Sequence, residues 1–409
     1  MSNSAVLGAI VYEAEASWGE DVTTFATQRL NIIAAVDTSG LTHDKIDSER
    51  VVQYRNDGTR YIQGTMGGSF KTKLHWTGHG STMVGSPTVD AAETFLALAF
   101  GSAVNLSATS STTLTGGTAA VPTTTASGTF DAGGLCRVGV LGDGDGDGQL
   151  YSITTHTALD LTLRGALNGA PLSGAVLYPV FQIHGPEAPT TTAVTGTRFL
   201  LQTANLQYEA HGCFPTAVAI DGLNPGEVPT IEITWSVSWW RYSTATFPSA
   251  ATQTGPFNAA AIAAGSLNVQ DVGTTTRNAR SYRNLTLNHT LGVEPLMGPG
   301  GVSANQKIVG ARRTPDKIEI SWTEDADAAT TTPVLPGYGT GTTFKHIEFT
   351  GSTADGSAFG FSCPRVCITN IATQKADGNL NRLTITGRAH TSTTTTTELT
   401  LAAIVYGSA

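Results

Sequence analysis

The segment from Asp143 to Gly148 alternates aspartate with glycine, a spacing found in loops that hold calcium. Such loops place carboxylates at their first, third and fifth positions, which Asp143, Asp145 and Asp147 match, and then a glycine. The twelfth position is Thr154, where a bidentate glutamate is needed, and the flanking residues predict strands instead of helices. Asp-Gly is also a hairpin signal. We therefore favour a solvated acidic hairpin tip, with calcium binding as the alternative.

Two pairs of possible metal ligands lack the partners that a metal site needs. His75 and His79 form a strand-to-turn pair without a third ligand close in the sequence. Cys363 and Cys367 have no second cysteine pair at a zinc-site spacing. We interpret all four as structural residues and expect no metal and no cofactor.

Three acidic residues, Glu324, Asp325 and Asp327, could in principle act as the carboxylates of a glycosidase. They cluster where a strand is expected to end, so a solvated run of charge is the better interpretation. The chain also lacks the Gly-x-Ser-x-Gly elbow of hydrolases and the Gly-Lys-Ser/Thr loop that binds phosphates. We expect no enzyme activity.

The composition favours a structural protein that associates with itself. Only 13% of the 409 residues are charged, against ~25% in average soluble domains. Burying a charge costs more than burying a hydroxyl, so a polar but weakly charged surface suits a protein covered by its own copies. The net charge is −9, and the sequence has no basic stripe to hold nucleic acid by its phosphates.

No targeting signal is evident in the sequence. The first residues have no basic start and no sustained apolar core, and no apolar run approaches the ~18 residues of a membrane span. The four cysteines are too few and too scattered for a disulfide framework. We expect free thiols in a protein made in a reducing cytosol, without a membrane segment.

The segment Pro229 to Tyr242 alternates apolar and polar residues, which predicts a half-buried β-strand. Its phrase Ile231 to Trp235 returns as Ile318 to Trp322, starting at position 318 against position 231. A second matching strand precedes each copy, at Asn205 to Tyr208 and at Asn284 to Leu287. The sequence therefore predicts two related β units.

Turn residues and apolar spacing place two further elements. Asp57-Gly58 predicts a long projecting hairpin over Thr38 to Gly68. Ser86-Pro87-Thr88 and Gly101 bound a helix over Val89 to Phe100 with an apolar stripe that should face a sheet. The hairpin residues that we expect to make contacts are Arg50, Arg55, Asn56, Asp57 and Arg60.

The rest of the pattern is all β, so we predict a mainly β fold with duplicated sandwich or barrel modules and one flanking helix. Residues 105–127 are Ser, Thr, Ala and Gly of low complexity, which favours a linker. The expected units are a first β module (1–101 plus 197–245), a linker (102–127), an inserted small β-domain (128–188) and a second β module (266–409).

Several segments share the spacing and residue character of one family of proteins: Glu13 to Val22, Ile46 to Arg55, Gly64 to Trp76 with the helix ending at Gly101, the insert strands Gly134 to Gly142, Tyr151 to Thr155 and Leu159 to Leu163, and Ile368 to Arg388. They resemble the tail tube proteins of long-tailed, non-contractile bacteriophages (siphophage-like). The resemblance covers most of the chain, and the doubled module makes this chain longer than the commonest members.

The resemblance implies a structural virion protein. Six tube domains would close into a hexameric ring, and rings would stack into a hollow tail tube that conducts DNA during ejection into the host. The implied partners are the chain itself, tape-measure and tail-end proteins, and double-stranded DNA in non-specific passage. The implied location is the virion tail, after assembly in the host cytoplasm.

Within that expectation, the hairpin at Thr38 to Gly68 is the candidate contact between rings. The polar faces of the repeated strands are the candidate inner wall: Glu232, Thr234, Glu319 and Ser321. Within a Debye length of ~8 Å, an acidic wall repels duplex DNA, so the passing genome stays unattached. A plain solvent-facing surface is the alternative for both glutamates.

Two other classes of function remain open at the sequence level. One is a decoration or fibre-type β-protein of a virion or cell surface with carbohydrate-binding potential, which predicts a discrete oligomer and no tubes. The other is a glycan-active enzyme, which requires a pocket with converging carboxylates.

Overall fold

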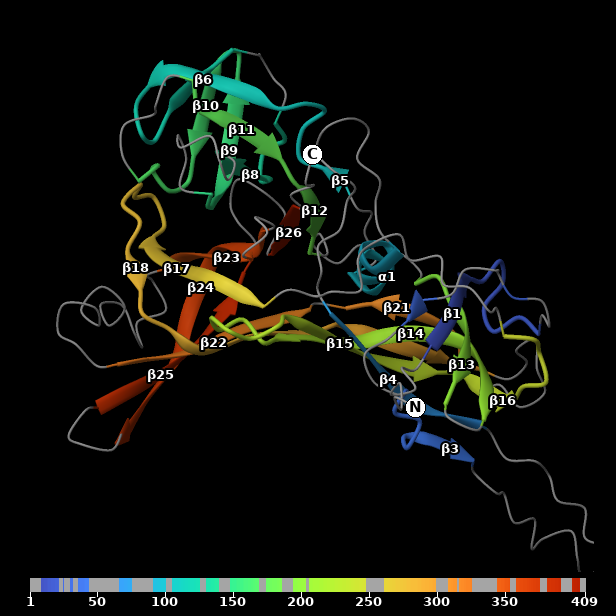
Figure 1. Cartoon of the computed structure of the whole chain (residues 1–409). Helices are drawn as coiled ribbons and strands as arrows, with labels where there is room; N and C mark the ends of the chain where they lie inside the picture. Colours follow the sequence, from blue (N-terminus) through green and yellow to red (C-terminus); the bar gives the residue numbers. More distant parts are fainter. Residues whose placement is uncertain are drawn as a thin grey trace, which may run out of the picture.

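The computed structural model confirms a mainly β protein with one helix (Figure 1). A network of antiparallel strands carries most of the chain, and a small closed barrel stands apart from it. The structure describes residues 9–21, 25, 30–31, 36–43, 66–75, 91–100, 105–125, 130–139, 148–168, 174–185, 194–203, 206–247, 261–298, 308–314, 316–325, 344–353, 358–375, 381–390 and 399–404.

The first module is a sheet in the order β3-β4-β15-β14-β13-β1-β2, with β16 paired to the first part of β14. Helix α1 (Ala91–Phe100) lies between β4 and β13 in the sequence. Its strands are β1 (Ala9–Ala14), β2 (Leu30–Asn31), β3 (Leu41–His43), β4 (Met66–His75), β13 (Thr197–Gln202), β14 (Gln207–Asp221), β15 (Thr230–Val237) and β16 (Trp239–Tyr242).

The second module repeats this order as β19-β22-β25-β24-β23-β17-β18, with β26 paired to the first part of β24. A two-stranded ribbon of β20 (Val293–Met297) and β21 (Ile308–Arg313) leaves it between β19 and β22. Its strands are β17 (Ile262–Asp271), β18 (Ala279–Arg280), β19 (Arg283–Thr290), β22 (Lys317–Asp325), β23 (Phe344–Thr353), β24 (Ala358–Lys375), β25 (Asn381–Ala389) and β26 (Thr400–Ile404).

Local irregularities recur at matching places in the two modules. Strands β14 and β24 each carry one extra residue against the neighbouring strand, Thr216 in β14 and Thr369 in β24. The Thr216 hydroxyl donates to the carbonyl of Thr234 at 3.2 Å, and the Thr369 hydroxyl donates to that of Thr386 at 3.2 Å. Bulges are specific features of a fold, so a matched pair with matched bonds marks equivalent positions.

The duplication is present, but the repeated sequence phrase does not mark it. Ile231 to Trp235 lies in β15, whose counterpart is β25, whereas Ile318 to Trp322 lies in β22, whose counterpart is β4. The match between Asn205 to Tyr208 and Asn284 to Leu287 is also wrong, because β19 corresponds to β3. The phrase recurs because any strand that is half-buried over a deep core favours alternating large apolar residues.

The modules join edge to edge where β14 pairs with β19. Ala217 lies opposite Thr290 and Ile220 opposite Leu287, and the amide of Leu291 donates to the carbonyl of Thr216 at 2.9 Å. The result is one continuous sheet of eight strands, β3-β4-β15-β14-β19-β22-β25-β24, which we call the joined sheet.

One face of the joined sheet is buried under a shared apolar core. In β15, the alternate residues Ile231, Ile233, Trp235 and Val237 are buried, which confirms the predicted half-buried strand. Helix α1 lies over this face, with the Phe95 ring 5.4 Å from the Trp235 ring. The helix is confirmed over its described residues, and its stripe faces the sheet as predicted.

A six-stranded closed barrel is inserted between α1 and β13, in the order β10-β7-β6-β11-β8-β9, and it has its own apolar core. Short strands β5 (Asn105–Leu106) and β12 (Phe181–His184) flank it and pair with each other, and β12 also pairs with β26. The barrel strands are β6 (Thr112–Gly117), β7 (Pro122–Thr124), β8 (Leu135–Val138), β9 (Leu150–Thr157), β10 (Asp160–Leu163) and β11 (Val176–Pro179).

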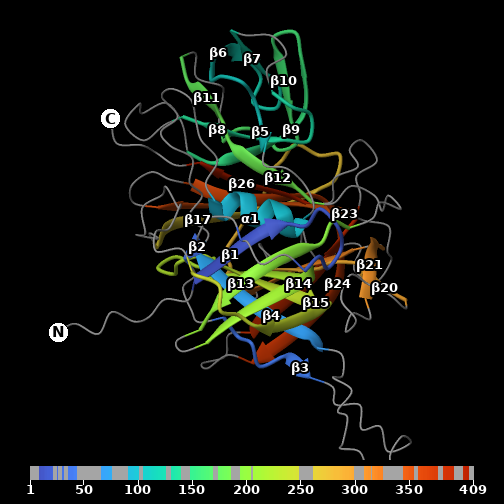
Figure 2. The same cartoon turned by 90° about the vertical axis from the view of Figure 1, so that its right-hand side faces the viewer.

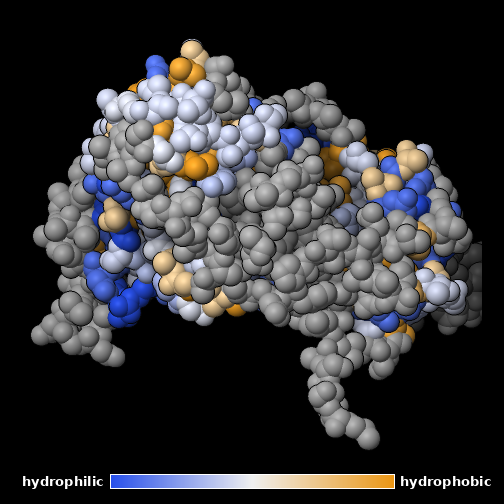
Figure 3. All heavy atoms as spheres, turned by 45° about the horizontal axis from the view of Figure 1, so that its top comes forward, coloured by the Kyte–Doolittle hydropathy of each residue, from blue (hydrophilic) through white to orange (hydrophobic). Residues whose placement is uncertain are grey.

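The linker predicted over 102–127 is therefore wrong, because β5, β6 and β7 lie within it. The side chains of Thr112, Leu114 and Thr124 are buried there. The threonines of this segment therefore belong to β-strands, which their branched side chains favour, and not to a linker. The barrel stands at one end of the molecule (Figure 2), and its surface is mostly pale on the hydropathy scale, as expected of threonine, serine and glycine (Figure 3).

Candidate assembly surface

The joined sheet has a second, open face on which most of the described side chains are polar. The helix and the barrel both lie on the other side of the sheet (Figure 1). One row across six strands runs through the residues Lys73, Glu232, Ala219, Asn288, Glu319 and Arg388.

All four residues predicted to line an inner wall lie on this open face. The side chains of Glu232 and Glu319 are 34% and 36% exposed, and Thr234 and Ser321 are half-buried. The two glutamates share one cross-strand row, separated only by Ala219 on β14 and by the residue opposite it on β19. The structure thus brings residues of both modules onto one surface.

This face is balanced in charge, which corrects the expectation of an acidic wall. Glu232 pairs with Lys71 at 2.8 Å, and Glu319 pairs with Lys317 at 2.9 Å. The hydrogen bond from Lys71 to Glu232 raises the pKa of that lysine above its usual value. The sequence could not show that Lys71 is the partner of Glu232, because the two residues are 161 positions apart in the chain.

Hydroxyl groups fill the rows between the charges. The Ser321 and Thr386 hydroxyls lie 3.4 Å apart, and those of Thr323 and Thr384 lie 3.3 Å apart. Hydroxyls bind water without attracting ions of one sign, so the face is wet and nearly neutral. The partly or fully exposed hydroxyl residues on it are Thr230, Thr234, Thr286, Thr290, Ser321, Thr384 and Thr386.

The other predicted contact residues fall outside the described part of the chain. These are the hairpin residues Arg50, Arg55, Asn56, Asp57 and Arg60, and the acidic loop residues Asp143, Asp145 and Asp147. The β20–β21 ribbon occupies the place in the second module that the predicted hairpin has in the first, since β19 and β22 correspond to β3 and β4. It exposes Leu296 and Met297, the latter at 64%.

Glu324 is not part of a solvated run of charge, so that interpretation is wrong for this residue. It is 1% exposed and accepts a hydrogen bond from the Trp322 indole at 3.3 Å, with the Arg280 guanidinium 3.8 Å away. Burial raises its pKa. Asp325 is partly exposed and pairs with Arg382 at 3.2 Å, and Asp327 lies outside the described residues. The described pair therefore does not converge on a pocket.

The other candidate ligands give no metal cluster. Cys363 is buried and Cys367 is partly exposed, and both lie in β24. His75 is half-buried in β4, and burial lowers its pKa, while His79 lies outside the described residues. Among the residues that the structure describes, no group of three or more His, Cys, Asp or Glu side chains could hold a metal ion.

A buried ion pair fixes the barrel to the second module. Glu348 of β23 accepts a bond from the barrel amide of Ser152 at 2.8 Å and pairs with Arg277 at 3.2 Å. The Arg277 guanidinium also lies 4.2 Å from the centre of the Tyr151 ring. The amide of Leu150 donates to the Thr350 hydroxyl at 3.1 Å. The barrel is thus held by directional polar contacts.

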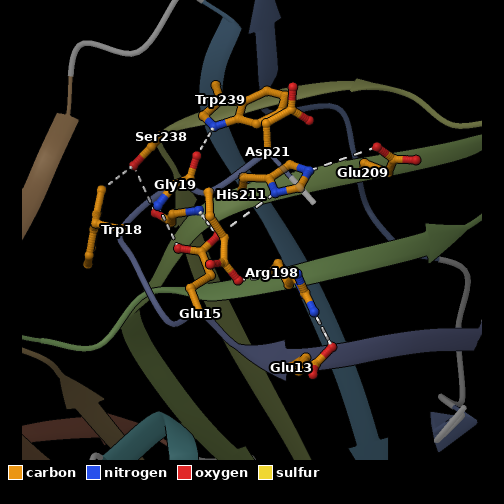
Figure 4. Close-up of polar contacts among 12 residues, drawn as sticks. Glu13, Glu15, Trp18, Gly19, Asp21, Arg198, Glu209, His211, Ser238 and Trp239 are labelled. Carbon is orange, nitrogen blue, oxygen red and sulfur yellow. Dashed lines mark hydrogen bonds and ion pairs between the residues drawn. The ribbon is translucent and has the colours of Figure 1, made fainter. Parts of the chain in front are cut away.

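A second polar cluster, missed at the sequence level, lies at the bend of β14 (Figure 4). Glu15 is fully buried and accepts the amides of Gly19 and Gly212, each at 2.7 Å. The His211 ring stacks on Trp239 at 4.1 Å and lies 3.9 Å from a Glu15 oxygen. These residues come from distant segments, so no local spacing could reveal the cluster.

Burial shifts both titrating groups of this cluster toward their neutral forms. Desolvation raises the pKa of Glu15 to about 7, and backbone hydrogen bonds oppose it. Desolvation, with the charge of Arg241, lowers the pKa of His211 to about 4. Between about pH 4 and pH 7, both side chains are therefore mostly neutral.

Replacing Glu15 by glutamine should therefore change how stability depends on pH. Between about pH 4.5 and 7, folded Glu15 binds more protons than it does in the unfolded chain, so its contribution to stability falls as pH rises. Glutamine does not titrate, so the variant does not lose stability in this way. Its stability relative to the natural protein should rise by about 3 kcal/mol across that window. Urea unfolding at several pH values measures the difference.

The companion variant His211→Gln should show the opposite trend. His211 is neutral in the folded protein down to about pH 4, so its contribution to stability grows as pH rises from about 4 to 6.5. The stability of the variant relative to the natural protein should therefore fall as pH rises over that range. Differences that stay flat with pH in both variants would contradict the burial argument.

No protein-family model matches the sequence, and a search of curated proteins finds no significant match. No helix in the described part of the chain is long and apolar enough to cross a membrane.

Proposed function

We propose that this protein is a structural subunit of a phage tail tube, which assembles into stacked rings around a channel for DNA. The observation that supports the proposal best is the joined sheet, which spans two equivalent modules and has one wide, mostly polar face that the described helix and barrel leave uncovered. The resemblance to siphophage tail tube proteins points to the same function.

The duplication sets the number of chains in such a ring. The resemblance implies six tube modules in a ring, and each chain supplies two, so three chains complete it instead of six. Their joined sheets would form a cylinder of 24 strands, from eight strands in each chain. At ~4.8 Å between strands its diameter is at least ~37 Å. Barrels of 16–18 strands already enclose a water-filled channel.

The open face then lines the channel, with Glu232, Thr234, Glu319 and Ser321 on its surface. DNA carries a phosphate charge every ~1.7 Å along its axis. On this wall Lys71 and Lys317 are each paired with a glutamate, which weakens their attraction for the phosphates, so the DNA slides past. Tape-measure and tail-end proteins are the further partners in this proposal, and the proposed location is the virion tail.

Electron microscopy of the purified full-length protein tests the function. We expect rings with a central hole, and hollow filaments at higher concentration. Compact particles without a hole, unchanged up to high protein concentration, would contradict the proposal and favour a decoration or fibre-type protein.

The channel chemistry predicts an effect of reversing charge on the open face. The double variant Glu232→Lys and Glu319→Lys raises the net charge by four per chain, two at each site. Its tubes should retain linear duplex DNA in co-sedimentation at low salt and release it as salt rises, whereas natural tubes should not retain it. The matched control is Glu227→Lys with Glu294→Lys, which adds equal charge at exposed positions off this face. Equal retention by both variants would contradict the placement.

A further inference from the structure

We propose that the second half of β24 pairs with β3 of a second copy of this chain, in the way that β14 pairs with β19 within the chain. The inference rests on the proposed ring assembly and specifies its joint. It follows from the duplication: β14 corresponds to β24 and β19 corresponds to β3, so the internal junction is a template for the external one.

The β24 side of this joint is an open strand edge. Residues up to Cys367 pair with β23, and residues from Val366 onward pair with β25 on the other side. Beyond Cys367, no described strand lies on the edge away from β25. An uncovered edge of this length is a template for another strand, and native proteins normally protect such edges.

The β3 side offers the complementary edge. Leu41 to His43 pair with β4, and no described strand lies on their other side. At the internal junction the corresponding strand, β19, has both edges paired, with β22 and with β14. The first module thus lacks the neighbour that the second module has.

The pairing of β14 with β19 also gives the register of β24 against β3 in the proposed joint. The matched bulges place Ala217 of β14 at Asn370 of β24, and the ladders of β4 and β22 place Thr290 of β19 at Thr42 of β3. Since Ala217 lies opposite Thr290, Asn370 of one copy lies opposite Thr42 of the next. By the same step, Ile371 lies opposite Leu41.

Burial at these positions supports the joint. Ile371 and Leu41 are only partly buried against the core, whereas their counterparts at the internal junction, Val218 and His289, are each 1% exposed. Pairing of β24 with β3 would cover both apolar side chains. Because the two joined edges differ, the contact is head-to-tail and closes into a ring by rotation.

Cysteine cross-linking tests the register. The pair Thr42→Cys and Asn370→Cys is introduced with Cys367→Ser, because Cys367 is a partly exposed thiol on the same strand. Residues opposite each other on paired strands lie within the Cα distance of a disulfide. Oxidation of assembled protein should give covalent dimers and trimers on a denaturing gel, with the trimer at three times 42.4 kDa, about 127 kDa.

Two control pairs make the result decisive. Ala217→Cys with Thr290→Cys lies at the internal junction and should cross-link within one chain, which verifies the oxidation. Thr42→Cys with Ala372→Cys is two residues out of register on the same face of the strand and should give at least tenfold less product. Preferential cross-linking of this out-of-register pair would overturn the register.

The outcomes also separate this inference from the proposed function. Hollow tubes without cross-linking at Thr42 and Asn370, with the internal control cross-linked, overturn the joint and leave the tube function intact. A covalent trimer in a protein that never forms tubes supports the joint and contradicts the tube. If neither trimers nor tubes form while the internal control cross-links, both proposals are wrong.

Discussion

Replacing Glu348 by alanine should lower the free energy of unfolding by about 3–5 kcal/mol, because it leaves the buried charge of Arg277 without its partner. Both side chains are less than 5% exposed, and Glu348 also accepts the Ser152 amide of the barrel. Urea unfolding followed by circular dichroism measures the loss. Because the contact holds the barrel, proteolysis should also cleave the barrel strands sooner in the variant.

A neutral bond at the same interface provides the matched control. Thr350→Val removes the hydroxyl that accepts the Leu150 amide and should cost only about 1 kcal/mol, since no charge is left unpaired. The double variant Arg277→Met with Glu348→Leu should be more stable than Glu348→Ala. A loss below about 1 kcal/mol for Glu348→Ala would show that water reaches this pair.

Replacing Thr373 by proline should weaken ring formation while the chain stays folded. At the internal junction, the bond from Leu291 to Thr216 shows that alternate residues of β14 turn their backbone groups toward β19. The corresponding β24 residues, Thr373 among them, turn toward the open edge. Proline removes one donor there, and it is tolerated on an edge strand whose amide faces solvent.

Sedimentation velocity and electron microscopy measure this effect, which we expect to be at least a tenfold shift toward single chains. Thr373→Ala is the control, because it removes the side chain and keeps the amide. Its rings should form normally. Assembly of the proline variant at natural concentrations would show that this edge is not a joint.

The sequence predicted the half-buried strands because their alternating pattern is local, whereas the repeated phrase from which a duplication was inferred joins strands that are not equivalent. Ile231, Ile233 and Trp235 alternate with polar residues, and the structure buries them in that order. The equivalence of strands was missed because the copies share pairing order and not residues: Trp235 corresponds to Gly387. Backbone hydrogen bonds preserve a fold while side chains diverge. The repeat is therefore visible in the order in which the strands pair and not in the residues.

The barrel boundary and the polar clusters were missed for different reasons. Threonine-rich segments suit both linkers and strands, and burial of Thr112 and Thr124 depends on partners brought by the fold. The Glu15 cluster and the Glu348 pair join residues about 70 to 200 positions apart, such as Glu15 and Gly212 or Glu348 and Arg277. Spacing along the chain carries no signal for such contacts.

The barrel interrupts only one of the two modules. If each module were a separate, identical chain, all six modules of a ring would carry the same barrel on the outside. Fusion of two copies frees one of them to diverge, so a proposed ring bears three projections separated by three plain sectors. In the proposed tube, the channel would keep its near sixfold regularity while the exterior would have threefold symmetry, so additions to the outside would not disturb the path of the DNA.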